Sequence, residues 1–392
     1  MSLSERLYVS ALRAALPLLP LLGHGEGKLA RGIRGRRRVL QRMRRWAAQE
    51  RDRARPLVWF HAPSVGEGLQ ARAVVEALRA RRPDVQVAYT FFSPSAEKFA
   101  RSVPADFADY LPLDLPGTVG RALDLLCPDV LAFSKTDVWP VLTREARRRG
   151  VRLAMLSGTL PEGSSRLRGP ARALLGPAYA RLHHVAAISP ADAERFGALG
   201  VPPERCTVMG DARFDQVWKR AAAADRASDL LHSVADPSRA TLVAGSTWPP
   251  DEERLVPAVR TALDGGHRLR LLLVPHEPTP AHLEESEALL DRHGLSHVRL
   301  SSLDEAPGGR DVLLVDRVGV LGDLYAAGEL AYVGGGFGTA GLHSVLEPAA
   351  FGLPTLFGPR HANAREAGEL VGAGAAWAVE DGEELTRRLL HL

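Results

Sequence analysis

The segment Leu330-Ala331-Tyr332-Val333-Gly334-Gly335-Gly336-Phe337-Gly338-Thr339-Ala340-Gly341-Leu342-His343-Ser344-Val345-Leu346-Glu347-Pro348 decides the fold that we expect for this chain. Its four apolar residues predict a buried strand, its glycines a turn, and a helix is expected to follow. Glycines let a backbone approach a phosphate closely, and a helix N-terminus offers free N–H groups. We expect Glu347 about one turn into that helix, where its carboxylate could bind a sugar hydroxyl. The segment therefore indicates either a site for a nucleotide-bound sugar or a plain glycine-rich connection in an α/β core.

Apolar runs and helical patterns alternate along the rest of the chain. Strands are expected at residues 57–61, 85–92, 130–133, 152–156 and 184–188, and again at 240–244, 269–274, 312–315, 330–333 and 354–357. Strands that alternate with helices imply parallel pairing and right-handed crossovers. Because the series restarts near residue 240, we expect two Rossmann-like, doubly wound α/β domains that face a cleft. Ligands of such sheets bind beyond the C-terminal ends of the strands.

The composition limits the class of protein to which the chain can belong. The chain has 392 residues, of which 45% are hydrophobic and 24% charged, as in soluble two-domain proteins. Cys127 and Cys206 are its only cysteines, so a disulfide framework is not expected and a reducing compartment fits. No Cys and His group has the spacing of a zinc site, and no Asp-x-Asp pair occurs. We therefore expect no metal and no cofactor.

Positive charge is concentrated near the N-terminus. Residues 28–45 contain nine Lys and Arg and no acid, so a net charge of +4 leaves about −5 for the rest of the chain. This pattern indicates one anionic contact and argues against nucleic acid as a partner. The apolar stretch 7–22 before it is too short and too interrupted by proline to span a bilayer comfortably. The pair of segments is typical of a helix in a membrane interface, although a first helix packed on its own domain would read the same way.

We accordingly divide the chain into four parts. Residues 1–50 are expected to form the apolar and basic membrane-associating segment, 51–215 the N-terminal domain, 216–239 a linker and 240–392 the C-terminal domain.

Several charged residues follow expected strands of the N-terminal half. Glu67 comes just after the first strand, where it could act as general base on an acceptor hydroxyl or merely favour a helix N-terminus. Lys135 and Asp137 are either cleft residues or a surface ion pair. Asp211 and Arg213 precede the expected linker and fit a structural ion pair as well as a site.

Candidate phosphate contacts follow the strands of the C-terminal half. Ser246 and Thr247 could donate to a phosphate, but both residue types are also common helix caps. His276 could contact phosphate or base. His343 and Ser344, in the glycine-rich segment, are expected to help neutralise a single phosphate.

Seven segments in series resemble one family. They are residues 59–67, 90–95, 110–114, 135–140, 209–215, 245–248 and 334–359, and together they cover almost the whole chain. On these segments the sequence is similar to the 3-deoxy-D-manno-octulosonic acid (Kdo) transferases, which add Kdo to the lipid A precursor of lipopolysaccharide. The resemblance implies a GT-B glycosyltransferase fold with an interdomain active site. It also implies an inverting, metal-independent transfer from CMP-Kdo to an acceptor hydroxyl.

The resemblance assigns roles to individual residues. The essential glutamate of the family matches Glu67, which becomes the proposed base, with Ser64, Gly66, Lys135 and Asp137 nearby on the acceptor side. The CMP-binding positions match the C-terminal half, at Ser246, Pro275, Gly334, Gly335, Gly336, Gly338 and Glu347, with Thr247, His276, His343 and Ser344 beside them. Residues 51–215 thus become the acceptor-binding domain and 240–392 the CMP-sugar-binding domain.

This sequence also departs from the family pattern. Many relatives have Glu at Lys135, Arg-His at His276-Glu277 and Asn at Ser344, and Pro63 stiffens the turn before Glu67.

The partners that the resemblance implies are CMP-Kdo, a lipid A precursor and the anionic surface of the inner membrane. The protein would lie at the cytoplasmic face of that membrane, peripheral or monotopic. Two alternatives remain open: another GT-B nucleotide-sugar enzyme, such as a UDP-sugar transferase or epimerase, and a non-catalytic scaffold that binds lipid.

Overall fold

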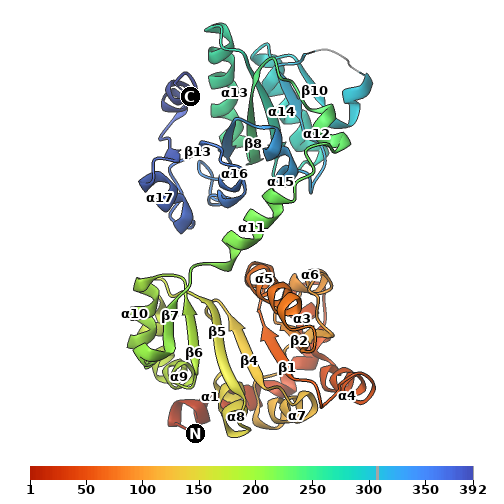
Figure 1. Cartoon of the computed structure of the whole chain (residues 1–392), viewed down its shortest axis with the longest axis vertical. Helices are drawn as coiled ribbons and strands as arrows, with labels where there is room; N and C mark the ends of the chain where they lie inside the picture. The colour runs from red at the N-terminus through yellow and green to blue at the C-terminus, as the bar shows by residue number, and fades with distance from the viewer. Residues whose placement is uncertain (306–308, 392) are drawn as a thin grey trace. The chain divides into compact units, whose positions relative to one another are not determined.

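A computed structural model describes residues 1–305 and 309–391 of the chain. These residues divide into two compact units, Met1–Gln216 and Val217–Leu392. Each unit is an α/β domain built on one sheet of parallel strands (Figure 1).

The sheet of the first unit has seven strands in the order β3-β2-β1-β4-β5-β6-β7. The strands are β1 (Leu57–His61), β2 (Gln86–Phe91), β3 (Phe107–Tyr110), β4 (Val130–Ser134), β5 (Arg152–Gly158), β6 (His184–Ala187) and β7 (Cys206–Val208). The helices between them are α5 (Val65–Arg81), α6 (Ala96–Ala100), α7 (Pro116–Leu126), α8 (Pro140–Arg148), α9 (Gly169–Ala180) and α10 (Pro190–Ala198). Because the order reverses at β1 and β4, the carboxyl ends of these two strands form the ligand-binding edge typical of a Rossmann sheet.

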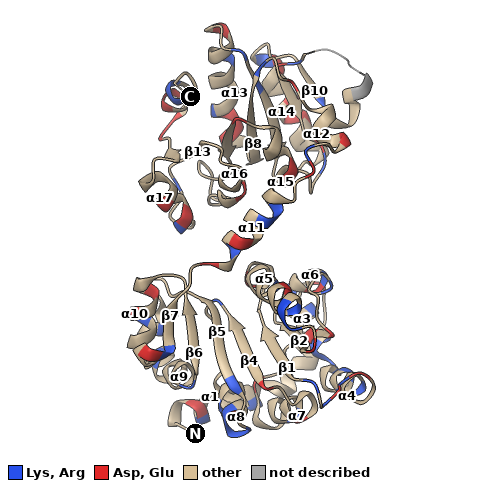
Figure 2. Cartoon of the chain, in the orientation of Figure 1, with Lys and Arg blue, Asp and Glu red and all other residues tan. Residues whose placement is uncertain are grey.

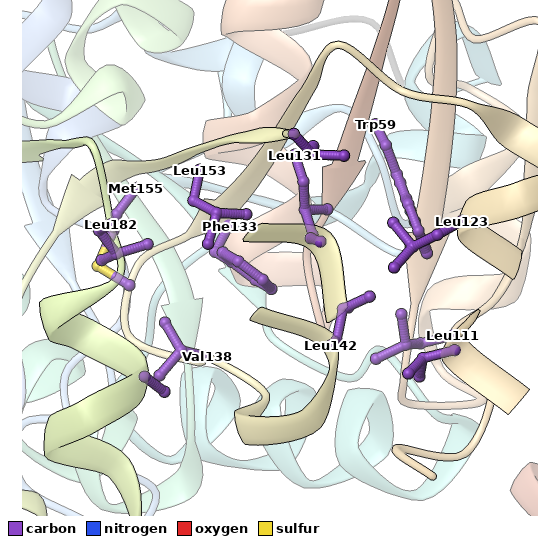
Figure 3. Close-up of a cluster of buried hydrophobic side chains, with 14 of the residues drawn as sticks. Trp59, Leu111, Leu123, Leu131, Phe133, Val138, Leu142, Leu153, Met155 and Leu182 are labelled. Carbon is purple, nitrogen blue, oxygen red and sulfur yellow. The ribbon is translucent and has the colours of Figure 1, made fainter. Parts of the chain in front are cut away.

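One hydrophobic cluster of the first unit joins this sheet to helices that include α7 and α8, and a second cluster joins it to α5 and α6. Trp59, Leu131, Phe133 and Met155 project from four adjacent positions of the sheet and are fully buried. Figure 3 shows their neighbours on the helices and loops, which include Leu123, Leu142 and Leu182. Strands covered on both faces read as continuous apolar runs, which is why the interior strands were predictable.

Four helices precede the first strand: α1 (Leu3–Ala15), α2 (Leu19–Leu22), α3 (Lys28–Arg36) and α4 (Val39–Gln49). The buried carboxylate of Glu5 on α1 pairs with Arg144 (3.1 Å) on α8 and with Arg181 (2.7 Å) just after α9. Met43 and Trp46 on α4 belong to the core. Residues 1–50 are therefore packed on the first unit through one face, while leucines such as Leu7 and Leu21 remain exposed on the other.

The second unit repeats the architecture with the strand order β10-β11-β9-β8-β12-β13-β14. Its strands are β8 (Ala240–Thr247), β9 (Leu269–Pro275), β10 (His297–Arg299), β11 (Val312–Leu314), β12 (Leu330–Val333), β13 (Thr355–Phe357) and β14 (Ala376–Ala378). Its helices are α12 (Asp229–Ser233), α13 (Pro249–Asp264), α14 (Pro280–Arg292), α15 (Leu321–Leu324), α16 (Leu346–Ala350), α17 (Arg365–Gly372) and α18 (Gly382–Leu389). Short 3-10 turns occur in both units, at Leu16–Leu18, Ser165–Leu167 and Pro203–Arg205 in the first and at Leu300–Glu305 and Tyr325–Ala327 in the second.

The boundary between the units falls inside α11 (Ala212–Ala222). The stretch 216–239, expected to be a linker, holds the end of this helix and the whole of α12. Leu231 and Val234 from this stretch are buried in the core of the second unit. Part of the expected linker is thus a packed element.

The helix expected directly after the glycine-rich turn begins only at Leu346, because the intervening residues form turns and bends. Glu347 is therefore in the first turn of a helix of five residues. Among the described residues, no helix combines the length and the apolar character needed to cross a membrane.

Candidate active site

In the first unit, the candidate site residues surround Glu67. Strand β1 ends at His61, and the turn that follows makes Ser64 the N-cap of α5. Glu67 occupies the first turn of α5, where the helix dipole stabilises a carboxylate. The Ser64 hydroxyl donates to Glu67 Oε2, and Lys135 Nζ lies 3.8 Å from Oε1. The Glu67 side chain is 20% exposed, so its carboxylate is held in place and still open to a ligand.

Lys135 is held in an unusual backbone conformation. Its φ of +68° lies in the left-handed region, which a side chain such as lysine rarely adopts. Its N–H donates to Leu156 O (2.8 Å) and its carbonyl accepts from Thr159 N–H (3.1 Å). Backbone strain of this kind persists where the surroundings enforce it and is concentrated at functional sites. Lys135 is therefore directed to Glu67 by the end of β4 and not by a flexible loop.

The other candidates of the first unit have structural partners. Asp137 forms an ion pair with Arg166. Asp211 accepts from Gln70 Nε2 (2.9 Å) and from Arg213 Nε (2.8 Å), and both Asp211 and Gln70 are buried. This pair therefore braces α5 one turn after Glu67, which favours the structural alternative.

Gly66 differs from these residues because it has almost no neighbour. A Cβ atom there would meet only Ser64 Oγ, at 4.0 Å, so space is open beside the start of α5.

In the second unit, the candidate site residues lie in and around the glycine-rich turn after β12. A Cβ atom on Gly334 would lie 2.2 Å from Ser246 O, and one on Gly336 would lie 2.6 Å from Gly358 N. Gly335 has a φ of +94°, and its Cβ would lie 2.1 Å from Gly341 O. These three glycines are thus required by close contacts within the unit. Their expected role in the approach of a ligand to the main chain stays a prediction.

Gly338 is the exception in this turn. The nearest atom to a Cβ built on it is Ala340 N, at 3.9 Å. No neighbouring atom of the protein requires glycine there, so this position leaves room for a phosphate next to the main chain.

Asp251 fixes the start of the turn. Its buried carboxylate accepts from Gly335 N–H (2.8 Å), Trp248 N–H (3.0 Å) and the Tyr332 hydroxyl (2.9 Å). Burial raises the pKa of Asp251, and these hydrogen bonds oppose the shift. The sequence did not single out Asp251 as a site residue, because two of its three partners, Tyr332 and Gly335, lie more than 80 residues away.

Three aromatic rings stack at the edge of this half-site. The ring centroids of His276 and His343 are 4.1 Å apart, and those of His276 and Trp248 are 5.1 Å apart. Trp248 Nε1 donates to His343 Nε2 (3.0 Å). Burial, with His276 adding to it, lowers the pKa of His343 to about 4. His343 is therefore neutral at pH 7 in this structure, and because Nε2 accepts from Trp248, its proton lies on Nδ1.

The remaining candidate residues for binding a nucleotide sugar are either buried or accessible. The Thr247 hydroxyl is buried and donates to Glu252 Oε1 (2.8 Å), so it supports the fold instead of facing a phosphate. Pro275 pairs with Thr247 at the end of β9. Ser246, with a φ of +54°, and Ser344 remain accessible.

Glu347 already has a partner in this structure. Arg220 Nη1 lies 3.3 Å from Glu347 Oε1, and the same guanidinium is 3.6 Å from Asp323. Burial raises the pKa of Glu347, while Arg220 lowers it. A sugar hydroxyl would therefore share this carboxylate with Arg220. Among the described residues, no group of three or more His, Cys, Asp or Glu is arranged to hold a metal ion.

Comparison with known proteins identifies relatives of both halves. The family model "3-Deoxy-D-manno-octulosonic-acid transferase (kdotransferase)" matches residues 37–216. The chain is 30% identical over 335 residues to the 3-deoxy-D-manno-octulosonic acid transferase of Bordetella pertussis, a match that covers 83% of this chain and 76% of that protein. It is 27% identical over 303 residues to the transferase of the same name from Haemophilus influenzae, covering 77% and 70%.

Solved structures support the fold. The UDP-GlcNAc 2-epimerase from Neisseria meningitidis bound to UDP-GlcNAc has a TM-score of 0.61 to this chain, at 11% identity, and covers 86% of this chain and 91% of its own. A putative UDP-N-acetylglucosamine 2-epimerase from Listeria monocytogenes has a TM-score of 0.60 at 13% identity, covering 86% and 87%. Together with the two parallel seven-stranded sheets, this likeness confirms the expected GT-B fold.

Proposed function

The chain belongs to the family of 3-deoxy-D-manno-octulosonic acid (Kdo) transferases, and from this membership we propose that it transfers Kdo from CMP-Kdo to a hydroxyl group of a lipid A precursor, with inversion, in lipopolysaccharide biosynthesis. The observation that carries the proposal is the setting of Glu67. Its carboxylate stands in the first turn of α5 with Ser64 on one oxygen and Lys135 near the other.

Glu67 would act as the general base. A base must lie within about 2.6–3.2 Å of the oxygen whose proton it takes. As Glu67 takes the proton, the acceptor oxygen forms a bond to the anomeric carbon of Kdo. The bond from that carbon to the phosphate oxygen breaks, and its electron pair leaves with CMP. Attack from the face opposite CMP inverts the configuration.

The leaving phosphate carries the developing charge, and the second unit would stabilise it without a metal. The open main chain at Gly338, the accessible hydroxyls of Ser246 and Ser344, and the Nδ1–H of His343 are the donors that support this part of the proposal. Fixed donors of this kind stabilise charge that develops in a transition state. Glu347 would bind a hydroxyl of the nucleotide sugar in competition with Arg220.

The N-terminal helices would hold the enzyme at the cytoplasmic face of the inner membrane. Leu3, Leu7, Leu18 and Leu21 are more than half exposed, and Figure 2 shows basic residues along α3. Exposed apolar side chains beside basic ones favour binding to anionic lipid surfaces.

The decisive experiment mixes the purified chain with CMP-Kdo and a lipid A precursor and reads the products by mass spectrometry. We expect the acceptor to gain the mass of Kdo, with the rate unchanged by a chelator. A parallel titration with CMP and UDP separates the proposal from a UDP-sugar enzyme of the same fold. No transfer together with a clear preference for UDP would contradict it.

A further inference from the structure

A large groove opens in the first unit beside the N-terminal helices. It encloses about 1130 Å³. Its apolar lining comes from three of these helices and from α7, and includes Leu19, Leu22, Leu29, Ile33, Leu40 and Leu125. These side chains are half-buried or exposed, so water covers an apolar surface that a ligand would bury.

The walls of this groove carry unpaired positive charge. Lys28, Arg37, Arg38, Arg44 and Arg121 line it, and none of them forms an ion pair with a carboxylate within residues 1–305 and 309–391. The one acidic side chain among the lining residues is that of Asp124, which pairs with Arg149 (2.8 Å). A ligand that fits both the apolar lining and this charge is an amphiphile with an anionic head.

The groove is also linked to the turn that bears the proposed base. Arg36, which lines the groove, stacks on Phe92 with 3.9 Å from its Cζ to the ring centroid and donates to Phe92 O (2.7 Å). The N–H groups of Phe92 and Ser93 donate to Pro63 O (3.1 and 2.7 Å). Pro63 lies four residues before Glu67. The wall of the groove and the catalytic turn are thus joined by main-chain hydrogen bonds.

Arg36 itself is incompletely satisfied. Its buried Nε has no hydrogen-bond partner among the residues that the structure describes, although an unpaired buried donor is costly. Burial lowers the pKa of Arg36 to about 10, so the guanidinium remains charged at neutral pH. Its Nη1 and Nη2 donate to Gly32 O (2.8 Å) and Phe92 O (2.7 Å), so Arg36 fixes the wall of the groove and adds positive charge to it.

We propose that the groove binds one acyl chain of the lipid acceptor, with a phosphate of the same lipid on the basic residues of the wall. This inference rests on the proposed function and adds to it where the lipid part of the acceptor is bound. A second copy of the chain is a poorer occupant, because a symmetric contact would bring the two sets of basic residues together. Each methylene that enters the groove adds to affinity by leaving water.

The test measures binding of tetradecyl phosphate to the full chain by calorimetry, below the micelle concentration of the probe. We expect one molecule per chain, and weaker binding of tetradecanol and of butyl phosphate. Ile33→Trp places bulk in the groove and should raise the Kd at least tenfold. Ile33→Ser, which adds no bulk, guards against a folding defect and should also weaken binding. The matched control is Val318→Trp, at an exposed valine of the second unit outside the groove, and it should bind like the unmodified chain.

A second measurement uses the acceptor with and without its acyl chains. Ile33→Trp should lower kcat/KM at least tenfold for the acylated acceptor and leave kcat/KM for the deacylated one within about twofold. Equal losses on both acceptors, a Kd for the probe unchanged by both Ile33 variants, or conversion of a dimer to a monomer by Ile33→Trp would each overturn the inference. Probe binding without any Kdo transfer would contradict the proposed function alone. Transfer without probe binding would contradict the groove alone.

Discussion

The contacts that position the Glu67 side chain can be kept while its ability to accept a proton is removed. Ser64 orients one oxygen and Lys135 lies near the other. Both contacts can persist with an amide in place of the carboxylate, so the base can be removed with little change in shape.

Glu67→Gln is therefore expected to lower kcat by about 10²–10⁴-fold, the range of general base catalysis, with CMP affinity little changed. The measurements are turnover by mass spectrometry and CMP binding by calorimetry. Glu76→Gln, on the outer part of the same helix where Glu76 pairs with Arg72, is the control and should be fully active. Turnover like that of the unmodified chain in Glu67→Gln would exclude Glu67 as the base.

Lys135 has both a strained backbone and a charged side chain. Substitution by glycine tests the two separately, through stability and through kcat. Because glycine adopts a positive φ freely, Lys135→Gly should raise the free energy of unfolding by up to about 1 kcal/mol. It also removes the ammonium group 3.8 Å from Glu67. Ion pairs this exposed are worth about 0.2–1 kcal/mol, so we expect kcat to fall about two- to fivefold. A less stable variant would refute the strain, and unchanged kcat would refute the role of the charge.

His61, at the end of β1, gives the fold a pH dependence. It is fully buried, accepts from Trp139 Nε1 (3.1 Å), and burial lowers its pKa to about 3. An unfolded histidine has a pKa of about 6.5. Between these two pKa values the unfolded chain binds a proton at His61 that the folded chain does not bind. The contribution of His61 to the free energy of unfolding is therefore fully present above pH 6.5 and is lost as the pH drops toward 3.

His61→Gln should remove this contribution. Between pH 7.5 and 5.0, urea titrations should show the unmodified chain losing about 2 kcal/mol more free energy of unfolding than the variant. The carboxylates and the other histidines are common to both chains and cancel. Parallel losses would mean that His61 is protonated in the folded protein.

The glycine-rich turn contains two kinds of glycine, and substitution distinguishes them. Gly334→Ala would place a Cβ atom 2.2 Å from Ser246 O, so we expect it to destabilise the second unit by at least about 1–3 kcal/mol, as overpacking does. Gly338→Ala meets nothing closer than 3.9 Å and should change stability by less than about 0.5 kcal/mol.

CMP binding completes this comparison. If the phosphate lies against the main chain at Gly338, Gly338→Ala should raise the Kd for CMP severalfold while the melting temperature stays constant. A Kd that does not change would place the phosphate elsewhere.

The strands that the sequence failed to predict share one position. All ten predicted strands are present, and β3, β7, β10 and β14 are the four that were missed. Each of them is an edge strand of three or four residues. Interior strands are covered on both faces and read as apolar runs, whereas a short edge strand needs only one partner and tolerates polar residues. Periodicity therefore detects the centre of such a sheet and not its border.

The candidate site was predictable to the same partial extent. Glu67 was identifiable because an acid directly after a strand lies at the ligand edge of the sheet. The hydrogen bond from Thr247 to Glu252 was not identifiable, because Glu252 lies on the next helix and no spacing rule relates the two residues. Trp248 and Asp251 were missed as site residues for the same reason, since their contacts are made in three dimensions.

Residues 1–50 carry the surface through which we propose that the molecule binds a membrane. Their inward face is anchored by Glu5, Met43 and Trp46, while their outward leucines are free to meet lipid. We expect the chain to bind vesicles that contain phosphatidylglycerol and to bind neutral vesicles more weakly. Salt should weaken the binding, because basic residues near a surface act through a screened field.

Leu18→Ser combined with Leu21→Ser should lower the vesicle partition coefficient about tenfold, since two exposed leucines lose their apolar contact with lipid. Val318→Ser is the control, because Val318 is even more exposed than these leucines but lies in the second unit. Sedimentation with vesicles gives the partition coefficient. Equal binding of all three chains would contradict the assignment of this surface to the membrane.

The contact of Glu5 with Arg144 and Arg181 also has a consequence during synthesis. Glu5 is translated well before both of its partners, so its carboxylate lacks Arg144 until the ribosome has added residue 144 and lacks Arg181 until residue 181 has been added. At roughly 5–20 residues per second, this interval is on the order of ten seconds. Throughout it the nascent N-terminal helices carry exposed leucines and a dense basic run, which is the state in which they are most available to the bilayer or to a chaperone.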